Sequence, residues 1–277
     1  MLEPALNLAR LQIRADAGQQ ALRLLDAMYR AVRDGTDLVI ENRTLPLTNL
    51  SGTRQEHHKL REWVWLQYLA DGIRTLALAG RWDEAVTHAK AHRGIGLHLM
   101  EGRQAAIIAH CLRGMPGAAR ALLEESTPTQ PWEQQVAPCL RVMCAEPSEA
   151  AASQNIKEMI EHFLDHQPLP GYAVFRARLG LTVAALASNT DIAAANHVHA
   201  QVTTEVIESG DGYAARDALT HRPLGDMSDA HRQALARLVA SSGLRAGKLP
   251  APLLDTLTCS VKTATVALTA TLRGHLI

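Results

Sequence analysis

The sequence predicts an all-α fold, in which antiparallel helix pairs stack side by side as an α-solenoid and one short β-hairpin is inserted near residues 36–50. Hydrophobic residues make up 47% of the 277 residues but aromatic residues only 4%, so Ala, Leu, Val and Ile must fill most of the core. That composition favours close-packed helices, because the strands of a β-sandwich prefer β-branched and aromatic residues. Apolar residues also recur at steps of three and four along most of the chain, which is the spacing of one helix face.

The first two helices are predicted at Ala5–Arg14 and Gln19–Arg33. In the second, Leu22, Leu25 and Met28 lie three residues apart and form an apolar stripe.

The segment Thr36–Leu50 carries the one convincing strand signal in the sequence. It contains β-branched residues in an alternating pattern, a turn residue at Asn42, and Pro46, which limits the second arm. These features predict a short β-hairpin or an extended loop.

A long helix is predicted from Arg54 to Ala79. Trp65 and Tyr68 widen its apolar stripe, so we expect burial on more than one face. The stripe itself consists of Trp63, Leu66, Leu69, Ile73 and Leu76.

The later helices are separated by glycine, proline and polar turns. Gly80 suits the left-handed position after a helix end, and Pro116 suits the first turn of a helix. The last helix is rich in threonine, a mediocre helix former. The predicted ranges are 81–93, 97 or 101 to 112, 116–125, 132–143, 148–166, 172–187, 190–209, 214–220, 229–241 and 252–273.

The clearest linker is the stretch QPLPG at residues 167–171. It divides the chain into repeat-like helices with the hairpin insertion, residues 1–167, and further helical pairs with the C-terminal helices, residues 168–277. We expect the two parts to pack as one continuous unit.

Similar turns recur at a constant interval, since Gly80, Gly114 and Ser148 lie 34 residues apart. The windows that begin there read GRWDEA, GMPGAA and SEAAAS, and each lies between two predicted helices. Small residues such as Ala85 and Ala119 follow each turn, where two helices must approach closely. This interval is typical of helical repeats, in which each helix pair buries its apolar face against the next.

The first window resembles the tetratricopeptide repeat (TPR). In that family a glycine closes the first helix of a unit, an aromatic residue opens the second, and an alanine packs against the first. Gly80, Trp82 and Ala85 match this pattern.

The second window keeps Gly114 and Ala119, but Pro116 replaces the aromatic residue. The resemblance covers about residues 3–209 when every degenerate unit is counted, and 60–166 by the clearest motifs. A generic α-helical bundle with a chance spacing is the alternative.

A TPR-like array implies an extended concave surface that is lined by the first helix of each pair and binds the ligand. A mixed polar lining suits an extended peptide or a helix of a protein partner. With the two glycine turns as register, the candidate groove residues are Gln67, Arg74, Glu101, Gln104, Gln135 and Arg141.

The array also resembles the TPR-like sensor part of actinobacterial helix-turn-helix regulators and the peptide-receiving part of Gram-positive cytosolic pheromone receptors. Those families carry a helix-turn-helix in front, whereas the first residues here predict repeat-like helices. We therefore expect a non-catalytic module that binds a protein or peptide, with a regulatory or accessory role and no direct contact with nucleic acid. A homodimer is compatible with this interpretation.

Charge and cysteine usage agree with a cytoplasmic binding protein. Lys and Arg number 28 and Asp and Glu number 28, so the basic excess of a non-specific nucleic-acid binder is missing. We expect no signal peptide and no membrane span. The four cysteines form no CxxC pair and predict reduced thiols: Cys111, Cys139, Cys144 and Cys259.

Two histidine pairs keep an alternative function open. His88 and His92, and likewise His162 and His166, lie four residues apart and can face the same side of a helix. No third ligand accompanies either pair, so we expect no metal and no cofactor. The alternatives are an all-α enzyme that uses these histidines with or without a bound metal, and a scaffold that self-associates through Trp63 and Trp65.

Overall fold

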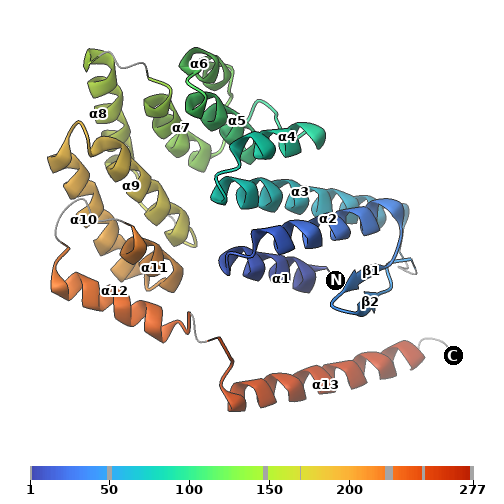
Figure 1. Cartoon of the computed structure of the whole chain (residues 1–277). Coiled ribbons are helices and arrows are strands. Elements are labelled where there is room, and N and C mark those ends of the chain that lie inside the picture. The colour runs from blue at the N-terminus through green and yellow to red at the C-terminus, as the bar shows by residue number, and fades with distance from the viewer. Residues whose placement is uncertain are drawn as a thin grey trace. The chain divides into compact units, whose positions relative to one another are not determined.

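The computed structural model describes residues 2–48, 52–145, 149–168, 170–221, 227–244 and 247–274 (Figure 1). Within these ranges the chain forms thirteen helices and one two-stranded sheet, which confirms the predicted all-α class. No helix in this part of the chain combines the length and the apolar composition that a membrane span needs. The helices are α1 (Glu3–Arg14), α2 (Gly18–Asp34), α3 (Arg54–Leu78), α4 (Trp82–Ala91), α5 (Glu101–Leu112), α6 (Pro116–Glu124), α7 (Pro131–Met143), α8 (Glu149–Asp165), α9 (Ala173–Ala187), α10 (Ile192–Ser209), α11 (Gly212–Thr220), α12 (Asp229–Ser241) and α13 (Ala251–Gly274).

The hairpin forms where the alternating segment predicts it. Strand β1 (Leu38–Ile40) pairs antiparallel with β2 (Arg43–Leu45). Glu41 and Asn42 connect them with φ values of 46° and 64°, and positive φ at both loop residues is what a tight hairpin turn of the right twist requires. Leu38 is buried and joins the core between α1, α2 and α3.

The chain divides into two compact units. Unit 1 consists of Met1–Gln167 and Thr182–Ala195, and unit 2 consists of Pro168–Leu181 and Asn196–Ile277.

In unit 1 every helix from α1 to α7 packs against the next one along the chain. Three pairs of alternate helices also pack together, α1 with α3, α3 with α5, and α5 with α7. Among the described residues, no comparable packing joins two even-numbered helices. Helices α1, α3, α5 and α7 therefore form one layer.

The two glycine turns of unit 1 have the same local geometry. Gly80 and Gly114 both have φ 70°, a left-handed conformation that glycine adopts without the steric cost of a Cβ. In each turn an amide donates to the carbonyl five residues earlier, Arg81 to Leu76 and Met115 to His110, at 2.9 Å. The third predicted turn, Ser148, lies outside the described residues. The two alanines that follow the turns are fully buried, Ala85 and Ala119.

Helix α3 is buried on two sides, but its stripe differs from the predicted one. Its first half contributes Val64 and Tyr68 to the core with α1 and α2, and its second half contributes Ile73 and Leu76 to the core with α4 and α5. Leu66, which we assigned to the stripe, is 42% exposed. The prediction for Leu66 was wrong, because α3 contacts helices on more than one side and its buried positions do not lie on a single face.

Helix α5 lies so close to the loop that follows α4 that a glycine is required at Gly102. A Cβ added to Gly102 would overlap the carbonyl group of Gly94. We expect Gly102→Ala to lower the free energy of unfolding by about 1–3 kcal/mol, since the overlap outweighs the gain in helix propensity of about 1 kcal/mol. Gly117→Ala is the matched control, because Gly117 is also helical and a Cβ there meets no atom within 4 Å. Urea unfolding followed by circular dichroism measures both, and equal midpoints for the two variants would contradict the close approach.

Unit 2 contains a buried ion pair between the helices α9 and α10. The guanidinium group of Arg176 donates to both carboxylate oxygens of Glu205, at 2.8 and 2.9 Å. Their side chains are only 6% and 9% exposed. Although burial opposes ionisation of Glu205, hydrogen bonds from Arg176 and Gln201 lower its pKa below the ordinary value. The pair fixes the register of these two helices within unit 2.

Candidate binding surface of unit 1

The predicted groove residues on α3 surround a buried carboxylate. The side chain of Asp71 is 1% exposed and accepts hydrogen bonds from Arg10 of α1, at 2.9 Å, and from Arg74, at 3.0 Å. Arg10 also donates to Gln67, at 2.8 Å. We call Arg10, Gln67, Asp71 and Arg74 the Asp71 cluster. Gln67 thus takes part in the α1–α3 contact, whereas Arg74 bonds Asp71 within α3 and its side chain is 48% exposed.

Sequence reasoning missed the two residues that organise this cluster. Asp71 lies on α3 four residues after Gln67 and three before Arg74, so an acidic residue within an apolar helix was the available signal. Arg10 lies 61 residues before Asp71. No local pattern places it there.

The four predicted groove residues on α5 and α7 differ in how deeply their side chains are buried. Glu101 and Gln104 are half-buried, and Gln104 donates to the carbonyl oxygen of Leu99, at 2.5 Å. Gln135 is buried, at 9% exposed. Arg141 is exposed and lines a pocket. Of the six predicted groove residues, only Arg141 belongs to this pocket.

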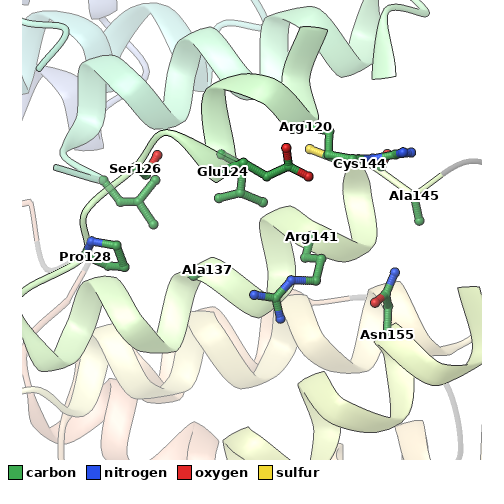
Figure 2. Close-up of a pocket in the computed structure, with 11 residues that line it drawn as sticks. Arg120, Glu124, Ser126, Pro128, Ala137, Arg141, Cys144, Ala145 and Asn155 are labelled. Carbon is green, nitrogen blue, oxygen red and sulfur yellow. The ribbon is translucent and has the colours of Figure 1, made fainter. Parts of the chain in front are cut away.

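The pocket lies between α6, α7 and α8 of unit 1 and has a volume of about 580 Å³. Figure 2 shows the side chains of Glu124 from α6, Arg141 from α7 and Asn155 from α8 around it. Its wall is partly apolar and carries two arginines, Arg120 and Arg141, and one carboxylate, Glu124. We call it the α6–α8 pocket, and it is lined by Leu99, Arg120, Leu123, Glu124, Ser126, Pro128, Ala137, Arg141, Cys144, Ala145 and Asn155.

A buried arginine holds the loop that forms one side of this pocket. Arg103 of α5 is 4% exposed and donates to the carbonyl oxygen of Leu122, at 2.7 and 3.1 Å, and to the hydroxyl of Ser126, at 2.7 Å. It also donates to the carbonyl oxygen of Gly96, at 2.7 Å. Because Ser126 lines the pocket, these bonds fix the pocket wall before any ligand arrives.

A second buried charged group holds the loop that precedes α5. Glu133, in the first turn of α7, is 1% exposed and accepts a hydrogen bond from the amide of Leu99, at 2.9 Å. It also accepts from the amide of Gln130, at 3.3 Å, and so caps α7. Leu99 is a pocket residue, so the same carboxylate positions the pocket wall and the helix start.

The first histidine pair lies in an aromatic cluster of α2, α3 and α4. The rings of Tyr29 and Tyr68 stack with centroids 4.8 Å apart, and His88 and His92 contact Tyr68 edge-on at 4.7 and 4.8 Å. Burial raises the pKa of Tyr68 to about 12, and burial lowers the pKa of both histidines. Within the described ranges, no three His, Cys, Asp or Glu side chains are grouped closely enough to hold a metal ion.

We expect acid to destabilise the folded chain through histidines that are partly or fully buried. Burial lowers the pKa of five of them below the ordinary value of 6.5, so the unfolded chain binds more protons than the folded chain just below that pH. The free energy of unfolding should therefore be highest above pH 6.5 and should fall as the pH decreases through 6.5. Urea unfolding at pH 7.5, 6.5 and 5.5 checks this. The variant His88→Gln should show a smaller dependence of the free energy of unfolding on pH. A flat profile would contradict it. The five are His88, His92, His162, His199 and His221.

The fold and the pocket define an all-α protein with a ligand-sized cavity between three consecutive helices. No protein-family model, curated protein or solved structure matches this chain.

Proposed function

We propose that the chain is a non-catalytic binding module with a regulatory or accessory role, and that a protein segment or peptide is anchored in the α6–α8 pocket. The observation that carries this proposal is the pocket itself, about 580 Å³ in volume, with a wall held in place by Arg103 and Glu133. Cavities of this size, partly apolar and with a few fixed polar groups, are typical of binding sites.

A TPR-like arrangement of unit 1 is part of the proposal. The packing of α1, α3, α5 and α7 on alternate neighbours supports it, because the first helices of successive TPR pairs pack in this way. The matched glycine turns at Gly80 and Gly114, and the fully buried Ala85 and Ala119, support the same register.

The pocket chemistry favours a segment that combines an apolar side chain with a carboxylate. Leu99, Leu123 and Ala137 offer apolar contact, while Arg120 and Arg141 outnumber the one acidic residue of the wall, Glu124. Arginine guanidinium groups bind carboxylates through paired hydrogen bonds.

The test uses a random peptide library displayed on phage and panned against the full chain. We expect enriched peptides to carry an acidic residue close to an apolar one. Arg141→Glu should weaken their binding about 10- to 100-fold, the loss of one charge-assisted contact, when binding is measured by fluorescence anisotropy. Arg237→Glu, at an exposed position on α12, is the control and should bind as the wild type does. If no peptide is enriched, or if Arg141→Glu binds unchanged, the proposal is wrong.

Self-association is a second candidate function, and helix α13 favours it. Leu254, Leu257 and Val261 of this helix are 49%, 52% and 57% exposed. The stripe continues at Ala264 with alternating steps of three and four, the spacing of a two-helix coiled coil.

A second copy of α13 is the partner that this stripe fits. Two charged residues of the helix, Asp255 and Lys262, lie off the stripe, so two copies can meet there without like-charge repulsion. A lone threonine-rich helix is marginal in water, so a stable α13 requires a partner. Trp63 and Trp65 are both half-buried in unit 1, and the indole N–H of Trp65 donates to the carbonyl oxygen of His92, at 3.0 Å, so the exposed stripe of α13 supports self-association better than their face does.

Light scattering after size exclusion tests this candidate. We expect the wild type to have twice the monomer mass of 30.1 kDa. Val261→Asp should restore the monomer, while Thr263→Asp, which is exposed and off the stripe, should not. A monomeric wild type would contradict self-association.

A further inference from the structure

Two cysteines that are 33 residues apart in sequence meet at the α6–α8 pocket. The Sγ atoms of Cys111, in the last turn of α5, and Cys144, at the end of α7, are 3.7 Å apart. Cys144 is 1% exposed and lines the pocket, and Cys111 is half-buried. The sequence alone predicts four reduced thiols, and no sequence pattern brings these two together.

We propose that Cys111 and Cys144 form a redox-sensitive dithiol, which a hydroperoxide converts into a disulfide that ties α5 to the end of α7 at the pocket wall. The sulfur atoms must approach from 3.7 Å to the bonded distance of about 2.05 Å. Side-chain rotation and a small helix shift supply this movement, because α5 and α7 already pack directly against each other.

The accessibility of the two thiols sets the order of the steps. The thiolate of Cys111, the more accessible of the two, attacks the O–O bond of the hydroperoxide, which releases an alcohol or water and leaves a sulfenic acid on Cys111. Cys144 then attacks that sulfur, and water leaves as the S–S bond forms. The two thiols lose two electrons in total, and the hydroperoxide gains them.

The surroundings of Cys144 suit it for the second step. Burial and the neighbouring Cys111 raise the pKa of Cys144 to about 12, so its thiolate is scarce and it reacts slowly with peroxide in solution. Once Cys111 is oxidised, the sulfur of Cys144 is already in contact with it, and proximity replaces nucleophilic strength. Cys139 also lies on α7, and burial raises its pKa to about 12.

The effect on ligand binding depends on the proposed function, whereas the disulfide does not. Because Cys144 is a wall residue, we expect oxidation to change the affinity of a peptide selected on the reduced chain. Peptide mapping detects the bond without any ligand, so a failure of the pocket proposal and a failure of the dithiol proposal are distinguishable.

The experiment treats the reduced full chain with hydrogen peroxide, counts the thiols after denaturation, and maps tryptic peptides without reduction. We expect the thiol count to fall from four to two, and a linked pair of peptides, residues 104–113 and 142–157. Trypsin cleaves after Arg141, so Cys139 falls in a different peptide from Cys144. The melting temperature should rise by roughly 5–10 °C and return after reduction, as expected for a bond that closes a loop of this length.

Variants separate this bond from other oxidation products. Cys111→Ser should abolish the linked peptides, and Cys139→Ser should leave them unchanged. Cys144→Ser should leave a sulfenic acid on Cys111 that dimedone traps. Four titratable thiols after peroxide treatment, or links that involve only the exposed Cys259, would overturn the proposal.

Discussion

Replacing Arg103 by methionine should lower the free energy of unfolding by about 3–5 kcal/mol, because several buried hydrogen-bond partners lose their donor together. Arg103 is 4% exposed and bonds the carbonyl oxygens of Gly96 and Leu122 as well as the hydroxyl of Ser126. Methionine keeps the aliphatic volume, so the loss reports the hydrogen bonds rather than a cavity.

Arg103→Lys is the informative companion variant. Lysine keeps the positive charge but lacks the planar fork that reaches four partners, Gly96, Leu122, Ser126 and Glu125, so it should recover less than half of the loss. Urea unfolding followed by circular dichroism measures both variants. A loss below about 1 kcal/mol for Arg103→Met would show that the loop after α6 is not held by this side chain.

The same variants link stability to binding. Because Ser126 lines the α6–α8 pocket, Arg103→Met should also weaken a peptide selected on the wild type, even at temperatures where the variant stays folded. A peptide that binds both proteins equally would place its site outside the α6–α8 pocket.

The sequence predicts the elements of this fold well, because their signals are local. Gly80 and Gly114 end helices with φ 70°, as the repeat pattern requires. The hairpin follows from β-branched alternation around Asn42. Such features depend on residues within one or two turns of each other, so periodicity and turn chemistry are sufficient to find them.

The candidate site is harder to predict, because it depends on contacts between distant residues. The sulfur atoms of Cys111 and Cys144 meet only when α5 packs on α7, and Arg10 reaches Asp71 only when α1 packs on α3. A polar residue on a helix surface looks the same in sequence whether it faces solvent or a buried charge. For this reason Gln67 and Arg74 were assigned to a groove, although the structure gives both of them partners in the Asp71 cluster.

Removing the Asp71 carboxylate should lower the free energy of unfolding by about 2–4 kcal/mol, which is the second largest effect we expect. Asp71 is 1% exposed and joins Arg10 of α1 to Arg74 of α3. Asp71→Asn preserves the shape but loses the charge that both guanidinium groups approach. The two arginines then remain close together without a counter-charge.

A double-mutant cycle isolates the contact between α1 and α3. Arg10→Ala, Asp71→Asn and the double variant, compared by urea unfolding, should give a coupling energy of about 1–3 kcal/mol, because the carboxylate is withdrawn from solvent. The exposed pair Lys157–Glu161, with side chains 68% and 59% exposed, is the control and should give about 0.5 kcal/mol or less. Salt at 1 M should screen the control pair and leave most of the Asp71 coupling, since burial protects it from counterions. If both cycles give the same small coupling energy, the apolar residues stabilise the contact between α1 and α3, and the Asp71 cluster contributes little to its stability.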